Sequence, residues 1–303
     1  EKATIYIPYK YVSHSEVSFP NGAAGEPVMS VTYSWEPCAD GELYSQYYNV
    51  VTDSVGEPSG EDGTYTQDDV IRASSEEVAA CNYALVTMDN PLTESSADED
   101  DVYYPASLQF EEYTADTAHE AIANGTEIVE ISDGYYGSTT QEVKEDRSYT
   151  GQSVGQADNY VDYELLQYVK NTVSEDCKTI VVMGMSSVGC MVWSEVEPLA
   201  DAILMYYNGM SSVYGQESIA NIVTGHTEPS ALLPMQQPAS MEAVEAQQED
   251  VPRDVECYVD SDGNTYDFAF GLNWSGVIDD ERVATYSAEP LTTPETISYT
   301  TAE

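Results

Sequence analysis

The sequence predicts an α/β fold, with a mostly parallel sheet sandwiched by helices, an irregular Tyr-rich insertion and extended terminal arms. Three short apolar runs carry this prediction: Tyr83–Met88, Thr179–Met183 and Ala202–Tyr207. They have the length of strands and lack polar alternation, which is typical of parallel strands buried on both faces. Helical patterns lie between them, and such alternation is typical of α/β proteins.

The first part of the chain predicts strands, a loop, a helix and a buried strand. Residues 1–36 are β-like because apolar and polar residues alternate from Lys2 to Tyr11 and again after a Pro-Asn-Gly turn at 20–22. Residues 53–64, with one proline and several glycines, predict a loop. A helix is expected over 66–80, opened by Thr66 or Asp68, and the strand 83–88 follows it.

The second part repeats the α/β order. Residues 102–150 are Tyr-rich and irregular, with a strand at 126–131. The pattern then predicts a helix over 157–173, a strand at 179–183, a short helix at 195–199 and a strand at 202–207 that is expected to be central. A helix over 216–224 is closed by Gly225, and a small helix follows at 241–248. Residues 255–259 and 265–270 are expected to pair as strands around a turn.

We expect one domain over 1–286 and an extended arm over 287–303. Both ends read as extended segments, and an exposed strand is a template for pairing with another chain. Exchange of Glu1–Tyr11 and Ser287–Glu303 would then produce a homo-oligomer or filament. The alternative is that the first segment pairs inside its own domain and the tail is a linker. Because the chain begins inside a β-like segment, we expect that something upstream has been removed.

The net charge of the chain restricts the classes of partner that it is expected to bind. The chain holds 55 Asp and Glu against 9 Lys and Arg, for a formal net charge of -46. Such a surface repels phosphate, so nucleic acid and anionic membranes are not expected as partners. No apolar stretch approaches the roughly 20 residues of a membrane helix, so we expect a soluble chain. The excess of Tyr (25 against 4 Phe) suits half-exposed sheet faces, sugar-contacting surfaces or subunit contacts without choosing among them.

No cofactor is predicted, and calcium is the alternative that stays open. The run 98–101 is either a solvated acidic face or a calcium site. Asp260, Asp262 and Asn264 imitate the start of a calcium loop, but Thr265 stands where that motif needs Gly, so a hairpin turn is favoured. The five cysteines and three histidines lack metal spacing. One or two disulfides remain compatible with the sequence, although Cys177 and Cys190 are expected to be small buried apolar residues.

The order of several segments resembles a known family. These segments are Asp146–Ser148, Thr179–Met183, Leu199–Leu204, Ile219–Gly225, Glu228–Pro234 and Tyr266–Trp274. Together they resemble the C-terminal α/β sandwich domain of family 3 glycoside hydrolases, the β-glucosidase and β-xylosidase group. Tyr6–Tyr9 and Tyr103–Gln109 look like an anaerobic gut-bacterial branch of this family, and the resemblance covers about residues 1–286.

The resemblance implies a divided active site. Retaining glycosidases need two carboxyl groups about 5–5.5 Å apart. In the family the nucleophilic Asp lies on a TIM barrel that precedes this domain. The acid/base Glu of many members lies four residues before the Arg of a Gly-Glu-Gly-x-Asp-Arg motif, and the matching position here is Val143. Glu142 and Glu145 flank it as acid/base candidates, or they are ordinary solvated carboxylates.

Three functions therefore remain for the chain. The first is the C-terminal domain of a β-glucosidase-like enzyme, not catalytic on its own and completed by a separate barrel. The second is a non-catalytic structural protein that self-assembles through its arms. The third is a carbohydrate-binding module that uses Trp193, Trp274 and the many tyrosines as stacking platforms. Each implies an extracellular or cell-surface location, with carbohydrate, a barrel domain or a second copy as partner.

Overall fold

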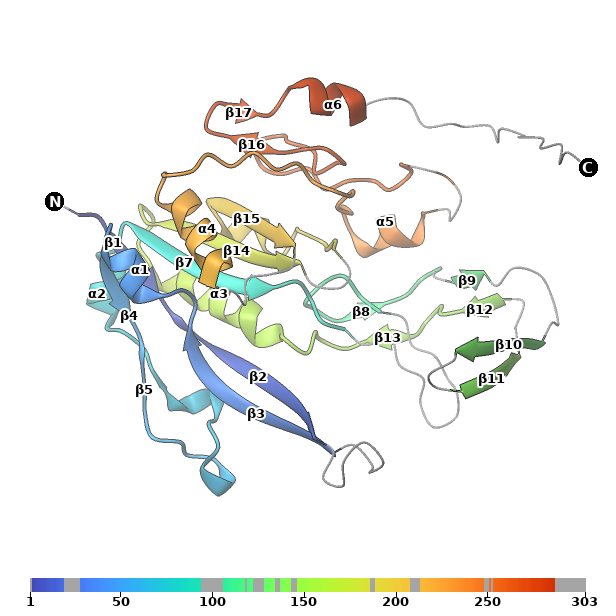
Figure 1. Ribbon diagram of the computed structural model, residues 1–303, viewed down its shortest axis with the longest axis horizontal. Helices are drawn as coiled ribbons and strands as arrows, with labels where there is room; N and C mark the ends of the chain where they lie inside the picture. Colours follow the sequence, from blue (N-terminus) through green and yellow to red (C-terminus); the bar gives the residue numbers. More distant parts are fainter. Residues whose placement is uncertain are drawn as a thin grey trace, which may run out of the picture. The chain divides into compact units, whose positions relative to one another are not determined.

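The computed structural model divides into two compact units (Figure 1). It describes residues 2–18, 28–93, 106–117, 119–121, 128–133, 137–142, 146–185, 189–207, 213–247, 251 and 253–286. Unit 1 comprises Glu1–Ala115 and Gly151–Glu228, and unit 2 comprises Asp116–Thr150 and Pro229–Glu303. The predicted division at residues 286 and 287 is not tested by this partition and stays a prediction.

A five-stranded sheet forms the centre of unit 1, and every neighbouring pair of its strands is parallel. Its spatial order is β15 (Ala202–Tyr207), β14 (Lys178–Met185), β7 (Tyr83–Asp89), β1 (Thr4–Ile7) and β4 (Asn49–Thr52). The α/β prediction, with its parallel sheet, is therefore confirmed. The N-terminal segment, which sequence reasoning offered as an exchange arm, contains β1, which pairs on both sides within its own sheet.

The core lies at the middle strands, because their side chains are buried on both faces. Leu85, Val86 and Met88 of β7 and Val181 and Met183 of β14 are fully buried. The expectation that 202–207 is a central strand is wrong, since β15 is an edge strand with half-buried residues. Apolar content alone does not distinguish an edge strand that a helix covers from a central one.

Helices cover both faces of this sheet. Helix α1 (Gly41–Ser45) contacts α4 (Val213–Val223), whereas α3 (Tyr160–Thr172) contacts α2 (Ser75–Ala79) and the 3₁₀ turn η4 (Glu197–Leu199). Right-handed crossovers on either side of a reversal in strand order place these two groups on opposite faces. The predicted helices over 157–173 and 216–224 correspond to α3 and α4.

The predicted helix over 66–80 is wrong. This stretch forms the 3₁₀ turn η3 (Gln67–Asp69), the short strand β6 (Val70–Ile71) and helix α2. Asp69 accepts hydrogen bonds from the backbone N–H groups of Ser59 (3.1 Å) and Thr66 (2.7 Å), so its carboxylate holds a turn. Strand β6 then pairs with β5 (Ser54–Val55). Helix α2 begins after this strand, at the capping box formed by Ser74 and Glu77.

Unit 1 also carries a long antiparallel hairpin, β2 (Tyr9–Ser18) and β3 (Val28–Pro37), which leaves the end of β1. A second ribbon pairs β8 (Tyr113–Thr114) with β13 (Ser153–Val154), and one 3₁₀ turn, η2, spans Glu61–Gly63. The turn predicted at 20–22 and the acidic run at 98–101 lie outside the described residues.

Unit 2 consists of short ribbons and helices. The ribbons pair β9 (His119–Ala121) with β12 (Asp146–Ser148), β10 (Ile128–Asp133) with β11 (Gly137–Glu142), and β16 (Leu272–Asn273) with β17 (Gly276–Val277). The helices are α5 (Met241–Glu245) and α6 (Glu281–Tyr286). The strand pair expected over 255–259 and 265–270 is reduced to one isolated bridge, Val259 to Thr265.

The described cysteines, Cys38, Cys81, Cys177, Cys190 and Cys257, are all free thiols. Cys177 is buried, as expected, and Cys190 is half-buried. Among the described helices none is long and apolar enough to cross a membrane. Within the same part of the chain no three His, Cys, Asp or Glu side chains gather into a possible metal site.

Candidate functional site

The strand order identifies the edge of the sheet where a site is expected. In chain order the five strands run 5-4-3-1-2, so the direction of winding reverses between β1 and β7. Open α/β sheets bind ligands beside the carboxyl ends of their strands, at such a reversal. The residues that follow these strand ends are Tyr9 and Lys10 after β1, Asp53 after β4 and Asn90 after β7.

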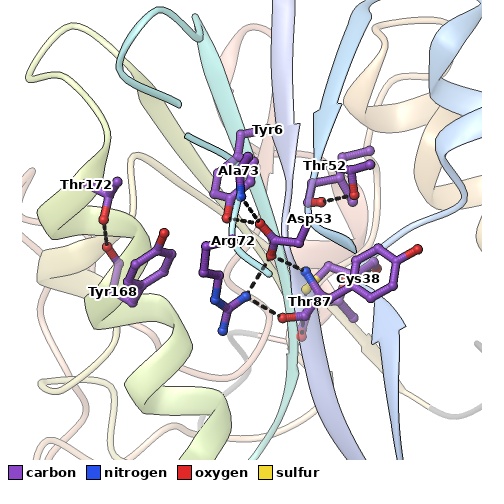
Figure 2. A network of polar contacts seen from close by, with 11 residues as sticks. Tyr6, Cys38, Thr52, Asp53, Arg72, Ala73, Thr87, Tyr168 and Thr172 are labelled. Atoms are coloured by element: carbon purple, nitrogen blue, oxygen red, sulfur yellow. Dashed lines mark hydrogen bonds and ion pairs between the residues drawn. The ribbon is translucent and has the colours of Figure 1, made fainter. Parts of the chain in front are cut away.

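Asp53 is the centre of a buried polar network (Figure 2). Its carboxylate accepts hydrogen bonds from the Tyr6 hydroxyl (2.8 Å), the Tyr9 N–H (2.9 Å), the Ala73 N–H (2.9 Å) and Nη1 of Arg72 (2.7 Å). The side chain is fully buried, and burial beside this carboxylate raises the pKa of the Tyr6 hydroxyl far above its usual value. Four donors to one carboxylate fix the ends of β1 and β4 relative to residues 72–73.

Arg72 lies between two aromatic rings. Its guanidinium carbon is 5.3 Å from the centroid of the Trp35 ring and 4.9 Å from that of Tyr168, which α3 carries. Figure 2 shows the arginine between that helix and the strand that leads to Asp53. Nη1 donates to Asp53 and to the Tyr9 carbonyl (2.8 Å). Within the described part of the chain its hydrogen bonds use Nη1 alone, so Nε and Nη2 remain free to donate.

A cavity of about 200 Å³ opens beside this arginine. Two cationic groups and one carboxylate share its wall with six apolar or aromatic side chains. Its lining residues are Tyr9, Lys10, Tyr11, Trp35, Gln67, Arg72, Val161, Glu164, Leu165 and Tyr168. We call this cavity the aromatic pocket. Apolar walls with a few convergent polar groups are typical of small-molecule sites.

The rings of the aromatic pocket are held in place by their own contacts. The Tyr11 ring lies 5.1 Å from that of Trp35 and 5.2 Å from that of Tyr33. The Tyr11 hydroxyl donates to the Tyr65 carbonyl (2.7 Å), and the Trp35 indole N–H donates to the Thr66 carbonyl (2.9 Å). A rigid platform loses little conformational freedom when a ligand binds.

A second polar cluster lies next to Lys10, where the strand order reverses between β1 and β7. Asp162, in the first turn of α3, accepts a hydrogen bond from the Asp89 N–H (3.3 Å) at the end of β7. Burial raises the pKa of Asp162 to about 6, and the nearby Lys10 acts in the opposite direction. Burial alone would lower the pKa of Lys10, but the groups around it, with the Asp162 carboxylate the strongest, together outweigh burial and raise that pKa. Gly184 leaves room here, because a Cβ would meet Asp89 and the Tyr206 hydroxyl.

A larger cavity, about 400 Å³, lies over Leu85, Thr87 and Val182 and is lined by α1 and α4. Its reactive group is the thiol of Cys38, which donates to the Thr87 carbonyl (3.8 Å). Burial raises the pKa of this thiol to about 11, so it stays protonated and is a poor nucleophile at neutral pH. Tyr44 is the aromatic residue in the lining of this larger cavity, and it is buried. The larger cavity therefore offers a ligand fewer aromatic contacts than the aromatic pocket does.

A comparison with protein families now places the chain. The family model for the glycosyl hydrolase family 3 C-terminal domain matches residues 21–274. The chain belongs to this family. Among solved structures it is similar to a β-glucosidase from Listeria innocua in complex with isofagomine, with 12% identity over 77% of this chain and a TM-score of 0.35. The match covers 25% of that enzyme's chain, and no curated protein matches this sequence.

The acid/base candidates of this family 3 domain are only partly placed. Glu142 ends β11, and the description there covers the backbone alone. Glu145 and Val143 lie outside the described residues. Whether either glutamate approaches a second carboxylate therefore stays a prediction.

The two tryptophans predicted to stack on sugars, Trp193 and Trp274, differ in their exposure to solvent. Trp193 is 0% exposed in the core of unit 1, so its assignment as a sugar platform is wrong. Trp274 is 61% exposed in the β16–β17 turn. The sequence reasoning missed Trp35, although the alternation of apolar and polar residues along 28–35 indicates a half-exposed strand face. It also missed Arg72, for which the available signal was the scarcity of cations in the chain.

The Asp260 region is a turn, as predicted. The Asp260 carboxylate accepts from the N–H groups of Asp262 (3.0 Å) and Asn264 (2.8 Å) and from the Asn264 side-chain amide (2.9 Å). Gly263 has a φ of 85°, which glycine adopts readily. The carboxylate is thus used within the turn.

Proposed function

We propose that this chain is a non-catalytic C-terminal domain of a β-glucosidase-like family 3 protein that binds a sugar unit in its aromatic pocket. A separate barrel domain would supply the nucleophile. The proposal rests on the guanidinium of Arg72, which lies against the rings of Trp35 and Tyr168 at the carboxyl ends of the strands. Its Nη1 bonds to Asp53, whereas Nε and Nη2 are available to a ligand. Family membership supplies the class of ligand.

The pocket offers complementary groups to a pyranoside. The aromatic side chains in the wall of the pocket suit the apolar C–H groups of a sugar ring, as aromatic rings do for other amphipathic partners. Nε and Nη2 of Arg72 form a fork of donors for two neighbouring hydroxyl oxygens, while the Glu164 carboxylate accepts from a third hydroxyl. Neutral hydroxyls also avoid the repulsion that an anionic ligand meets near a chain of net charge -46.

Two carboxylates of unit 1, Asp53 and Glu195, already have structural hydrogen-bond partners. Asp53 accepts from four donors and is fully buried, so its carboxylate has no access to a sugar. Glu195 accepts from the N–H groups of Phe110 (2.7 Å) and Glu111 (3.0 Å). These groups hold the fold and do not supply the carboxyl pair of a retaining glycosidase.

We expect the chain to bind methyl β-glucoside weakly, with a dissociation constant on the order of 1 mM, because the pocket is small and open. The three tryptophans give three indole N–H signals in an NMR titration. The Trp35 signal should shift saturably, while those of Trp193 and Trp274 stay in place. Trp35→Ala should weaken binding at least tenfold, and the control Trp274→Ala should leave it unchanged. A titration that moves Trp274 instead, or none of the three, would refute the pocket assignment.

A second candidate function is a non-catalytic extracellular structural protein that self-assembles. The exchange of terminal arms proposed from the sequence now depends on residues 287–303, which lie outside the described residues, because β1 is paired inside its own sheet. The observation that favours assembly is a different one, the long exposed β2–β3 hairpin.

A further inference from the structure

The larger cavity, between the sheet and helices α1 and α4, is separate from the sugar site proposed above. Among the described residues, none that lines the larger cavity also lines the aromatic pocket. Its volume of about 400 Å³ lies within the range of small-molecule pockets. Protein interiors contain few voids larger than a water molecule, so a space of this size exceeds ordinary packing defects. The larger cavity can therefore hold an organic molecule.

The floor of the larger cavity is apolar. The register of β7 and β14 places Leu85, Thr87 and Val182 on one face of the sheet, and all three line this cavity. The Thr87 hydroxyl donates to the Cys38 carbonyl (2.7 Å), and the Cys38 thiol donates to the Thr87 carbonyl. Because these polar groups bond to each other, a ligand meets mainly carbon atoms on the floor. Ile219 of α4 adds a further apolar side chain to the lining.

Two carboxylates supply the charge in the described lining of the larger cavity. They belong to Glu36 on β3 and to Asp40, the N-cap of α1. Oε1 of Glu36 pairs with His14 (2.9 Å), and Oδ1 of Asp40 accepts from the Glu42 N–H (2.9 Å). Within the described part of the chain, the side-chain bonds of both carboxylates use these two oxygens alone. Oε2 of Glu36 and Oδ2 of Asp40 therefore remain available to a donor.

These local groups indicate the chemistry of the ligand. We propose that the larger cavity binds an organic ammonium ion, whose apolar body lies over the floor and whose charged head bonds to the carboxylates of Glu36 and Asp40. A bond between an ammonium group and a carboxylate is stronger than one between neutral groups, so a neutral molecule of the same shape binds less tightly. An anion is repelled by the same carboxylates. The ligand class is therefore primary amines with an aromatic or short alkyl group.

Phenethylamine is the probe for this site. The titration is followed by carbon–proton NMR in about 0.15 M NaCl, where a Debye length of about 8 Å screens general attraction to an acidic surface. Methyl signals of Leu85, Val182 and Ile219 should shift saturably, with a dissociation constant on the order of 1 mM. The Trp35 indole signal of the aromatic pocket should stay in place. The neutral analogue 2-phenylethanol should bind at least about fivefold more weakly, and 3-phenylpropionate should not bind.

Two variants test whether the carboxylates hold the ammonium group. Asp40→Asn and Glu36→Gln each remove one charge and keep the shape of the side chain, and asparagine caps a helix about as well as aspartate does. Each should weaken phenethylamine binding at least about threefold and leave 2-phenylethanol binding unchanged. Glu42→Gln is the matched control, because Glu42 is exposed in the first turn of the same helix and does not line the cavity. It should bind phenethylamine like the wild type.

The outcomes separate this cavity from general attraction of amines to an acidic protein. Methyl signals of Leu85, Val182 and Ile219 that stay in place would overturn the proposal, because the probe then does not enter the cavity. Equal affinities for phenethylamine and 2-phenylethanol in the wild type would also overturn it. So would an equal loss in Glu42→Gln, since binding would then follow total charge. The three substituted residues are exposed, so circular dichroism should show unchanged folding in each variant.

Discussion

Replacement of Asp53 by alanine should lower the free energy of unfolding by about 3–5 kcal/mol, the usual cost of removing one partner of a buried ion pair. The variant leaves Arg72 without its buried counter-ion. It also removes the acceptor of the Tyr6 hydroxyl and of the N–H groups of Tyr9 and Ala73. Buried donors without acceptors account for much of this cost.

Urea denaturation followed by circular dichroism measures this loss. Glu36→Ala is the matched control, because Glu36 pairs with His14 at 2.9 Å but the two side chains are 48% and 51% exposed. Exposed pairs of this kind contribute less than about 1 kcal/mol. If Asp53→Ala were no more destabilising than Glu36→Ala, the network would not be what joins β1 and β4 to residues 72–73.

Asp162→Asn should stabilise the protein at pH 8 and have much less effect near pH 4. Burial raises the pKa of Asp162 to about 6, above the value of about 3.9 in an unfolded chain. The folded state therefore binds this proton more tightly. The contribution of protonated Asp162 to the free energy of unfolding is complete below about pH 4 and is lost as the pH rises through about 6. A difference of about two pKa units corresponds to roughly 3 kcal/mol, and asparagine removes the charge that causes the loss.

Unfolding free energies of both proteins at several pH values between 4 and 8 measure this difference. Asp158→Asn is the control, because Asp158 lies just before the same helix and is exposed. The control should differ from the wild type by a small and constant amount. A constant difference for Asp162→Asn as well would show that this carboxylate does not titrate in the range that its burial implies.

The sequence was sufficient for the elements that long apolar patterns determine. Strand β7 and helix α3 were found because a buried strand and an amphipathic helix each need a run of suitable residues in one place. The family followed from the order of such segments. The position of β15 was missed because strand order depends on which helices pack on which face, and no local pattern records it.

The aromatic pocket could not be predicted in the same way. Asp53 and Arg72 meet only because β4 ends beside the segment that follows β6, and neither residue lies in a periodic pattern. The two tryptophans were distinguishable in principle. Trp193 ends the apolar run 190–193, which indicates burial, whereas Trp35 stands in an alternating strand with a polar face.

Hydrolysis of a chromogenic β-glucoside by this chain alone tests the central claim most directly, since we propose that the chain binds a sugar without turnover. The assay uses the substrate above the dissociation constant measured by NMR, with the buffer rate and the Trp35→Ala variant beside it. We predict no product above the buffer rate from a sample that binds methyl β-glucoside. Turnover that disappears in Glu142→Gln or Glu145→Gln would contradict it and would make the chain an enzyme in its own right.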